Sequence, residues 1–254
     1  MGMARSILGD NRMKKFTMVA LCATSMFAVA QPAQAAIITG TFAVTALEGR
    51  TMGDGFNATE TNPFNGSTAS ATFTYTGGIN FDNRAGQSTG ATGDLNSTFG
   101  FTAGNVTNYL GTGTVSYMGS QVADFRTEAS FLASSGSSAN YQYGSLFTFN
   151  LGTLLAGTVL TITHDDGAAF YQGNTKIGNT VVGPTGVSTS TFTVQNTGNT
   201  VLRYTRQNGT PSVLIVDATS PVPEPATWAM MTLGFGAMGF AMRRKSAATR
   251  IRFA

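Results

Sequence analysis

Two adjacent carboxylates, Asp165 and Asp166, form the most suggestive chemical cluster in the sequence. They follow a run of alternating apolar and hydroxyl residues, 160–163, and precede Gly167, so we expect them on a tight turn between two strands. Neighbouring carboxylates repel each other unless a cation or turn amides compensate. Ca²⁺ takes six to eight oxygen ligands at about 2.3–2.6 Å, so the pair would need helpers.

Asn174, Asn208 and Asp217 are the candidate helpers for such a calcium site. The simpler interpretation is an Asx-type turn, in which an Asp side chain accepts hydrogen bonds from its own backbone and binds no metal. From the residues alone both interpretations stay open.

Catalytic groups are scarce. His164 is the only imidazole, and at a strand end we expect it to be packed or solvent-facing rather than catalytic. Glycoside hydrolysis needs two carboxyl groups about 5–9.5 Å apart across a cleft. Glu48, Glu60 and Glu128 are available, but their contexts do not point to such a pair. We therefore expect no enzyme.

Composition excludes several other classes of function. With one Cys and one His, the chain offers neither a disulfide framework nor a Cys/His zinc site. The formal charge of +3 comes from the two ends, because residues 36–221 hold ten acids and six bases. This acidic balance removes the main support for nucleic-acid binding.

The N-terminal end has the pattern of a secretory signal peptide, residues 1–35. A basic start at 13–15 leads into an apolar run at 16–30, which is shorter than the roughly 20 residues of a membrane span. Ala33 and Ala35 supply the small-x-small pattern that signal peptidase accepts, so we expect cleavage after Ala35. The only cysteine lies in the apolar run, so the exported chain would lack thiols, which fits an envelope or extracellular protein.

The C-terminal end combines a proline-rich spacer, an uncharged stretch at 226–242 and a basic cluster. The residues that define this pattern are Pro223, Glu224, Pro225, Trp228, Arg243 and Arg244. A stretch of this length is at the short end for a transmembrane helix. The basic cluster should stay cytoplasmic, with 246–254 as a basic cytoplasmic tail, which places the body outside.

These residues resemble the PEP-CTERM sorting signal, in its variant with Trp three positions after the second proline. The resemblance covers 221–245. It implies recognition by an exosortase, a transpeptidase-like membrane enzyme, in a Gram-negative bacterium that makes exopolysaccharide. We therefore expect export across the inner membrane, transient anchoring there, and then a cell-surface or extracellular location.

The body, 36–220, alternates apolar and small polar residues with a period of two, which is typical of half-buried strands. Clusters of Gly, Asn, Ser and Asp between the strands favour turns. We predict one antiparallel β-sandwich, jelly-roll-like and all-β, with long loops at 51–70, 84–96 and 134–140. The predicted strands include 39–44, 71–76, 97–102, 113–118, 121–132, 143–151, 158–164, 189–194, 201–204 and 212–216.

The order of elements over 157–216 is similar to the back half of the anthrax-protective-antigen-type β-sandwich. In that family a strand, an Asp-Asp-Gly turn, a hairpin and a late strand containing Asn-Gly recur. In its carbohydrate-binding members the paired aspartates hold Ca²⁺, which in turn holds a sugar. The resemblance implies Asp165 and Asp166 as the metal ligands.

The sequence thus predicts an exported, non-catalytic protein of the envelope or exopolysaccharide matrix, with a calcium-supported carbohydrate site at the Asp165–Asp166 turn. Two other functions stay open. One is a structural matrix component with no discrete ligand site. The other, less favoured, is a polysaccharide hydrolase.

Overall fold

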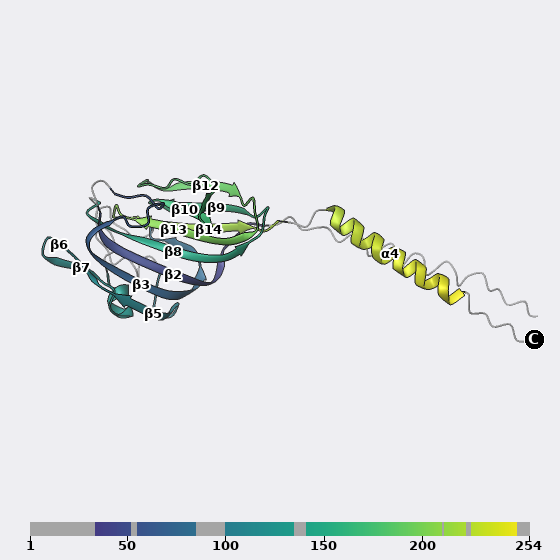
Figure 1. Cartoon of the computed structure of the whole chain (residues 1–254), viewed down its shortest axis with the longest axis horizontal. Coiled ribbons are helices and arrows are strands. Elements are labelled where there is room, and N and C mark those ends of the chain that lie inside the picture. Colours follow the sequence, from purple (N-terminus) through teal and green to yellow (C-terminus); the bar gives the residue numbers. More distant parts are fainter. Residues whose placement is uncertain are drawn as a thin grey trace, which may run out of the picture. The chain divides into compact units, whose positions relative to one another are not determined.

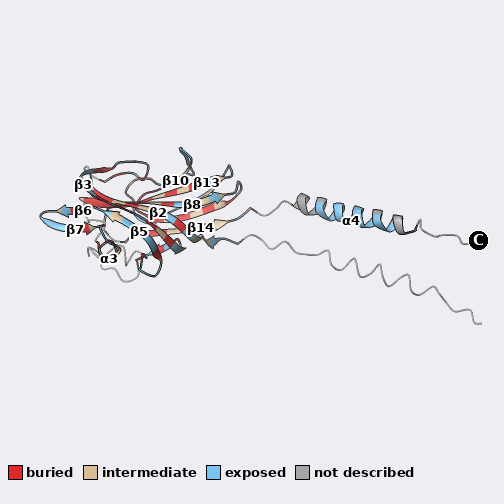
Figure 2. Cartoon of the chain, turned by 60° about the horizontal axis from the view of Figure 1, so that its bottom comes forward, coloured by how far each residue is buried: buried red, intermediate tan, exposed pale blue. Residues whose placement is uncertain are grey.

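The computed structural model describes residues 34–51, 55–84, 100–134, 141–209, 211–221 and 225–247. In these ranges most regular structure is β-strand, arranged as two antiparallel sheets and a separate hairpin (Figure 1). Burial alternates along strands such as β2, β3 and β9, whereas the start of β8, the start of β10 and the end of β13 are buried on both faces (Figure 2). This alternation follows from the period-two spacing of apolar residues.

The larger sheet has seven strands in the order β11-β10-β13-β8-β2-β3-β5. Its long central strands pair along most of their length, and the register shifts in β2–β3 after Gly49, in β13–β8 after Thr200 and in β3–β5 after Thr72. Its strands in chain order are β2 (Thr39–Thr51), β3 (Phe64–Gly78), β5 (Val106–Thr112), β8 (Tyr143–Leu154), β10 (Ala168–Gln172), β11 (Thr175–Ile177) and β13 (Gly198–Arg206).

The smaller sheet runs in the order β1-β14-β9-β12, with β4 also paired to β14. These strands are β1 (Ala36–Ile37), β4 (Asn80–Asp82), β9 (Val159–Asp165), β12 (Ser188–Thr193) and β14 (Val213–Thr219). The remaining strands, β6 (Thr114–Tyr117) and β7 (Ser120–Asp124), form the separate hairpin.

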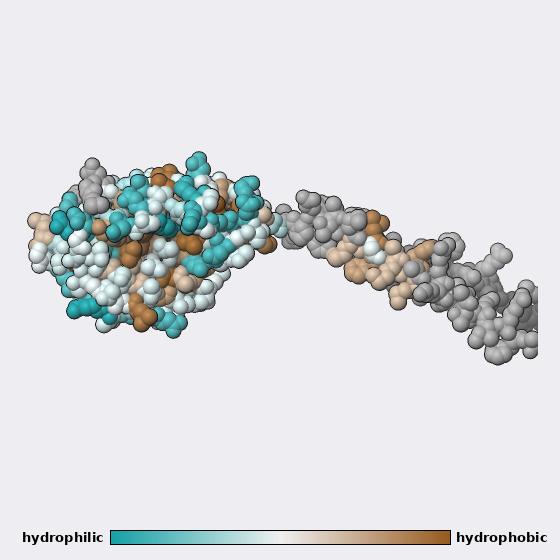
Figure 3. All heavy atoms as spheres, viewed as in Figure 1, coloured by the Kyte–Doolittle hydropathy of each residue, from teal (hydrophilic) through white to brown (hydrophobic). Residues whose placement is uncertain are grey.

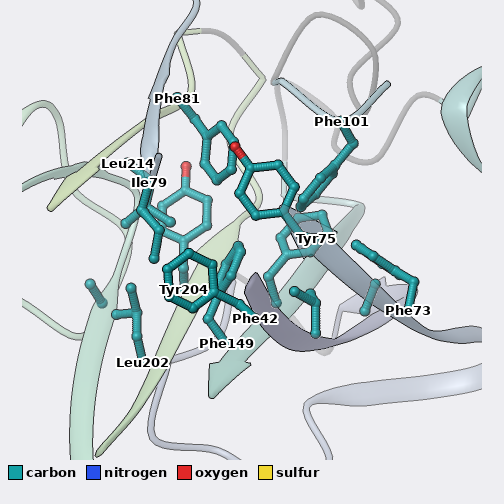
Figure 4. Packing of buried hydrophobic residues seen from close by; sticks show 14 of the residues in the cluster. Phe42, Phe73, Tyr75, Ile79, Phe81, Phe101, Phe149, Leu202, Tyr204 and Leu214 are labelled. Carbon is teal, nitrogen blue, oxygen red and sulfur yellow. The ribbon is translucent and has the colours of Figure 1, made fainter. Parts of the chain in front are cut away.

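One continuous hydrophobic core lies between the two sheets. The larger sheet contributes residues such as Phe149 and Leu202, and the smaller sheet contributes Ile162 and Leu214. Phenylalanine dominates the core, and Phe101 contacts several other aromatic rings within it (Figure 4). Interlocked aromatic side chains of this size account for much of the apolar area that the fold buries.

The predicted all-β fold is confirmed for the described residues, but three local predictions are wrong. The run 121–132 is not one strand, because β7 ends at Asp124 and a short helix, α3 (Glu128–Leu132), follows. Thr127 caps this helix by accepting a hydrogen bond from the Ser130 amide, and the Ser130 hydroxyl accepts one from the Thr127 amide. This capping box outweighs the strand preference of the run.

The other two wrong predictions concern one loop and one strand. The segment 51–70 is not all loop, since β3 begins at Phe64, and residues 100–102 of the strand predicted at 97–102 are not in a strand. Residues 85–99 and 135–140 lie outside the described ranges, and so do most of the other two predicted loops.

The C-terminal segment contains a helix, α4 (Pro225–Ala247), whose described side chains are exposed (Figure 2). Among the described residues, no helix combines the length and the apolar character needed to cross a membrane. The predicted transmembrane helix is therefore not confirmed. The signal peptide up to Ala33 and the motif residues Pro223 and Glu224 lie outside the described residues, whereas Ala35 and Arg243 are described and exposed.

Candidate functional site

The Asp165–Asp166 turn is the corner at which the chain crosses from the smaller sheet to the larger one. Asp165 ends β9, and Ala168 begins β10 in the other sheet. Gly167 is needed at this corner, because a Cβ atom there would lie 2.0 Å from the carbonyl oxygen of Val182. The peptide bond between the two aspartates is cis.

Strand β13 holds this corner in place through several hydrogen bonds. The Thr205 amide donates to the Gly167 carbonyl at 2.8 Å, and the Gly167 amide donates to the Thr205 hydroxyl at 3.0 Å. The Tyr204 hydroxyl donates to the carbonyl of Asp165. Because β13 is a central strand, the two aspartates are fixed by the body of the fold rather than by a loop.

The carboxylate of Asp166 has two oxygens in different environments. Its Oδ2 accepts hydrogen bonds from the backbone amides of Gln207 at 2.8 Å and Asn208 at 3.2 Å. Its Oδ1 is buried and has no hydrogen-bond partner of ordinary geometry among the described residues, although the Thr185 amide and the Asp165 carboxyl lie near enough to the carboxylate to affect the pKa values of the pair. Distant backbone amides, rather than the turn's own backbone as in an Asx turn, therefore hold this carboxylate.

Both carboxyl groups are largely removed from water. Asp165 is 9% exposed and Asp166 is 3% exposed. Burial raises the pKa of Asp165 to about 7, with a further contribution from the neighbouring charge of Asp166. Burial also raises the pKa of Asp166, against the opposing effect of the amides that donate to it. A cation bound between them would favour the ionised forms.

His164 is packed inside the sandwich and is fully buried. Its Nδ1 lies 2.5 Å from the carbonyl oxygen of Asp166, and since that oxygen only accepts, we place the ring proton on Nδ1. Burial lowers the pKa of the ring, so it is neutral at pH 7. His164 thus supports the turn from the core side.

Only one of the three candidate helpers lies at the turn. Asn208 is exposed and donates its backbone amide to Asp166. Asp217 pairs with Thr161, four residues before Asp165 along β9, and Asn174 sits in the hairpin at the far end of β10. Within the described ranges, no group of three or more His, Cys, Asp or Glu side chains could hold a metal ion.

A buried polar row beside the turn was missed at the level of the sequence. Glu48, Ser145 and Arg206 are paired across β2, β8 and β13, and all three side chains are fully buried. Ser145 donates to Glu48 at 3.0 Å, and Arg206 Nε donates to the Ser212 hydroxyl at 2.6 Å. Burial raises the pKa of Glu48 to about 8 and lowers that of Arg206 to about 10.

The period-two pattern contained the signal for this row. Glu48 continues the inward series of Val44 and Ala46, and Arg206 continues that of Leu202 and Tyr204. Gln207 was also missed. Its side chain exchanges two hydrogen bonds with the backbone of Phe56, 151 residues away, and no local pattern indicates a contact of that range.

Residues 221–245 match the family described as the PEP-CTERM protein-sorting motif. The chain carries a PEP-CTERM sorting motif. The motif marks an exported protein that is sorted to the cell envelope or surface and implies processing by an exosortase. Among curated proteins, none matches the chain.

Two solved structures are similar to the chain. One is a PA14 sugar-binding domain from an RTX adhesin, with a TM-score of 0.36 and 17% identity over 70% of this chain and 87% of that one. The other is the PA14 domain of the MpAFP antifreeze protein, with a TM-score of 0.35 and 15% identity over 74% of this chain and 84% of that one. Scores this low support no inference about the site.

Proposed function

We propose that the protein is a non-catalytic component of the cell surface or matrix that binds carbohydrate through Ca²⁺ held at the Asp165–Asp166 turn. The observation that carries the proposal is Oδ1 of Asp166, a buried carboxylate oxygen with no hydrogen-bond partner of ordinary geometry among the described residues. A buried polar atom without a partner costs free energy. A cation between the two carboxylates would remove that cost.

The donor chemistry of the turn fits Ca²⁺. The ion prefers hard oxygen ligands, and the turn offers two carboxylates beside the exposed residue Asn208, whose backbone amide donates to Asp166. These groups supply fewer than the six to eight oxygens that Ca²⁺ takes. The open coordination positions are where sugar hydroxyls would bind, and this is how a metal at the turn would serve recognition.

The turn also has the rigidity that a binding site needs. Asp166 is anchored to Gln207, and Gln207 is anchored to Phe56, so the carboxylate is positioned before any ligand arrives. A preorganised site loses less conformational entropy on binding.

The proposed absence of catalysis rests on where the carboxyl groups lie. Glu48 is buried between the sheets, whereas Glu60 lies in the loop after β2 and Glu128 in the first turn of α3. Asp165 and Asp166 share one turn and leave no gap for a glycosidic bond between them.

A glycan array probed with the purified chain tests this function. We expect binding to a subset of glycans in millimolar Ca²⁺ and its loss in EDTA and in the Asp166→Ala variant. Asp217→Ala is the matched control, because it removes the same charge from β14 at a distance from the turn. Binding that persists in EDTA, or that Asp217→Ala removes equally, would contradict the proposal.

The second candidate function is a structural matrix protein with no discrete ligand site. The outer faces of both sheets favour it, since they present hydroxyl pairs such as Thr161–Thr191 and Thr41–Thr76 rather than charged groups. In the face shown in Figure 3 the body is mostly of hydrophilic or intermediate hydropathy, with small separate apolar spots. If the glycan array shows no calcium-dependent binding, that result would favour this alternative.

A further inference from the structure

A cavity of about 430 Å³ opens where β2, β3 and β6 meet. It is lined almost entirely by polar groups, namely Arg50, Thr51, Asn65, Gly66, Ser67, Thr114 and Ser116. None of these residues takes part in the Asp165–Asp166 turn. The cavity is therefore a separate feature of the fold.

The register of the sheet creates this cavity. Gly49 pairs with Thr68, but the next residue, Arg50, pairs with Asn65, so that Gly66 and Ser67 bulge out of the ladder. A bulge of this kind redirects the side chains beside it. The opening is thus built into strands of the larger sheet and does not depend on a loop.

Gly113 brings the opposite wall of the cavity into place. It has a φ of +84° between β5 and β6, and a Cβ atom there would lie 2.4 Å from the Thr68 carbonyl oxygen. Only glycine permits this close approach. The contact sets the start of β6 against the bulged end of β3 and so brings Thr114 and Ser116 to the cavity.

Arg50 is the only charged residue among the described residues that line the cavity. Its guanidinium carbon lies 6.0 Å from the ring centroid of Tyr117, which is itself 5.9 Å from the ring of Tyr143. The described part of the chain shows no ion pair for Arg50. A cation held against an aromatic ring and surrounded by hydroxyls remains available to an anion.

We propose that this cavity binds an acidic sugar, with the carboxylate of a uronic acid residue on Arg50. A guanidinium matches a carboxylate with two parallel hydrogen bonds. The Asn65 amide and the Ser116 hydroxyl match the hydroxyls of the sugar ring, since each can donate and accept, whereas the Thr51 hydroxyl donates to the Tyr141 carbonyl and can only accept. The half-buried ring of Tyr117, which contacts Arg50, offers a partial stacking surface next to the cavity.

The cavity and the Asp165–Asp166 turn lie at the same end of the sandwich. Arg50 pairs with Tyr143 on β8, and two residues further along β8 Ser145 pairs with Arg206, which precedes the Gln207 that holds Asp166. Neighbouring strands are about 4.8 Å apart, so a polysaccharide chain can reach both. The acidic-sugar site itself needs no calcium and does not depend on the proposed calcium site.

Isothermal titration calorimetry of the full chain with a short oligogalacturonate, carried out in EDTA, tests the proposal. EDTA removes any contribution of calcium, and a neutral galacto-oligosaccharide of equal length is the comparison ligand. We expect the acidic ligand to bind and the neutral one to bind at least about tenfold more weakly. Affinity should fall with rising salt, because the key contact is an exposed ion pair.

Three variants sharpen the test. Arg50→Gln should weaken oligogalacturonate binding by about tenfold or more, and Ser67→Phe, which fills the cavity without a change in charge, should also weaken it. Lys176→Gln is the charge-matched control on β11 and should bind like the wild type. The double variant Asp165→Ala/Asp166→Ala should also bind like the wild type in EDTA, which separates this site from the calcium site. Wild-type affinity in Arg50→Gln, or equal binding of the neutral ligand, would overturn the proposal.

Discussion

The backbone amide of Gln207 donates to Oδ2 of Asp166 at 2.8 Å, across 41 residues of sequence. This bond satisfies one carboxylate oxygen while Oδ1 of the same group stays buried without a partner of ordinary geometry among the described residues. The carboxylate is therefore fixed in position but not neutralised. Fixed, incompletely satisfied carboxylates are what a metal site needs before its metal binds.

Replacing Asp165 by Asn should stabilise the metal-free protein at pH 8. Burial and the charge of Asp166 raise the pKa of Asp165 to about 7, so at pH 8 the ionised carboxylate costs folding energy. We expect a gain of about 1 kcal/mol in urea unfolding in EDTA, reduced by the solvent that still reaches this group. Asp82→Asn is the control, because Arg84 lowers the pKa of Asp82 and the substitution should not stabilise. A loss of stability in Asp165→Asn would contradict this account.

The buried Glu48 should make the protein less stable as the pH rises from about 4.5 to about 8. Its pKa is raised from 4.5 to about 8 in the folded state, so in this window the folded chain holds a proton that the unfolded chain has lost. Glu48→Gln mimics the protonated acid and should flatten the slope, with a gain on the order of a few kcal/mol at pH 8. Urea unfolding at several pH values measures this, and parallel slopes for the two proteins would show that Glu48 does not titrate as described.

Ser212→Ala should destabilise the fold by about 1–3 kcal/mol. The Ser212 hydroxyl accepts from Arg206 Nε at 2.6 Å, and both residues are buried, so the substitution removes the acceptor from a buried charged donor. The exposed Ser116→Ala is the matched control and should change stability little. Equal chemical denaturation midpoints for the two variants would contradict the role assigned to Ser212.

Deleting residues 221–245 should separate export from sorting. The PEP-CTERM motif lies in this segment, whereas the predicted N-terminal signal and every described strand lie outside it. We expect the shortened protein to be exported and then lost from the cell envelope into the medium, which cell fractionation measures. Trp228→Ala should have the same effect in a chain of full length. Unchanged surface retention of both variants would show that the motif is not what sorts the protein.

The alternation of residues was enough to predict the all-β fold and the turn at Asp165. It failed where local hydrogen bonds compete with strand preference. At Thr127, the capping of α3 turns the second half of the predicted strand 121–132 into a helix. The alternation does not by itself single out Glu48 and Arg206, because a charged residue on an inward position of a strand becomes meaningful only when the buried partners on neighbouring strands are known. The bulge at Gly66 was read as loop, since a register shift depends on the partner strand and has no local signature.

The most direct test of the central claim is the thermal unfolding midpoint of residues 36–221, measured in EDTA and again in millimolar Ca²⁺. These residues contain every described strand. Calcium at about 100 times its Kd should add about 2.7 kcal/mol, or about 5–10 °C in a domain of this size. The Asp165→Ala/Asp166→Ala variant should show no shift, whereas Asp217→Ala should shift like the wild type. A wild-type midpoint that calcium leaves unchanged would contradict the metal site and with it the proposed mode of carbohydrate binding.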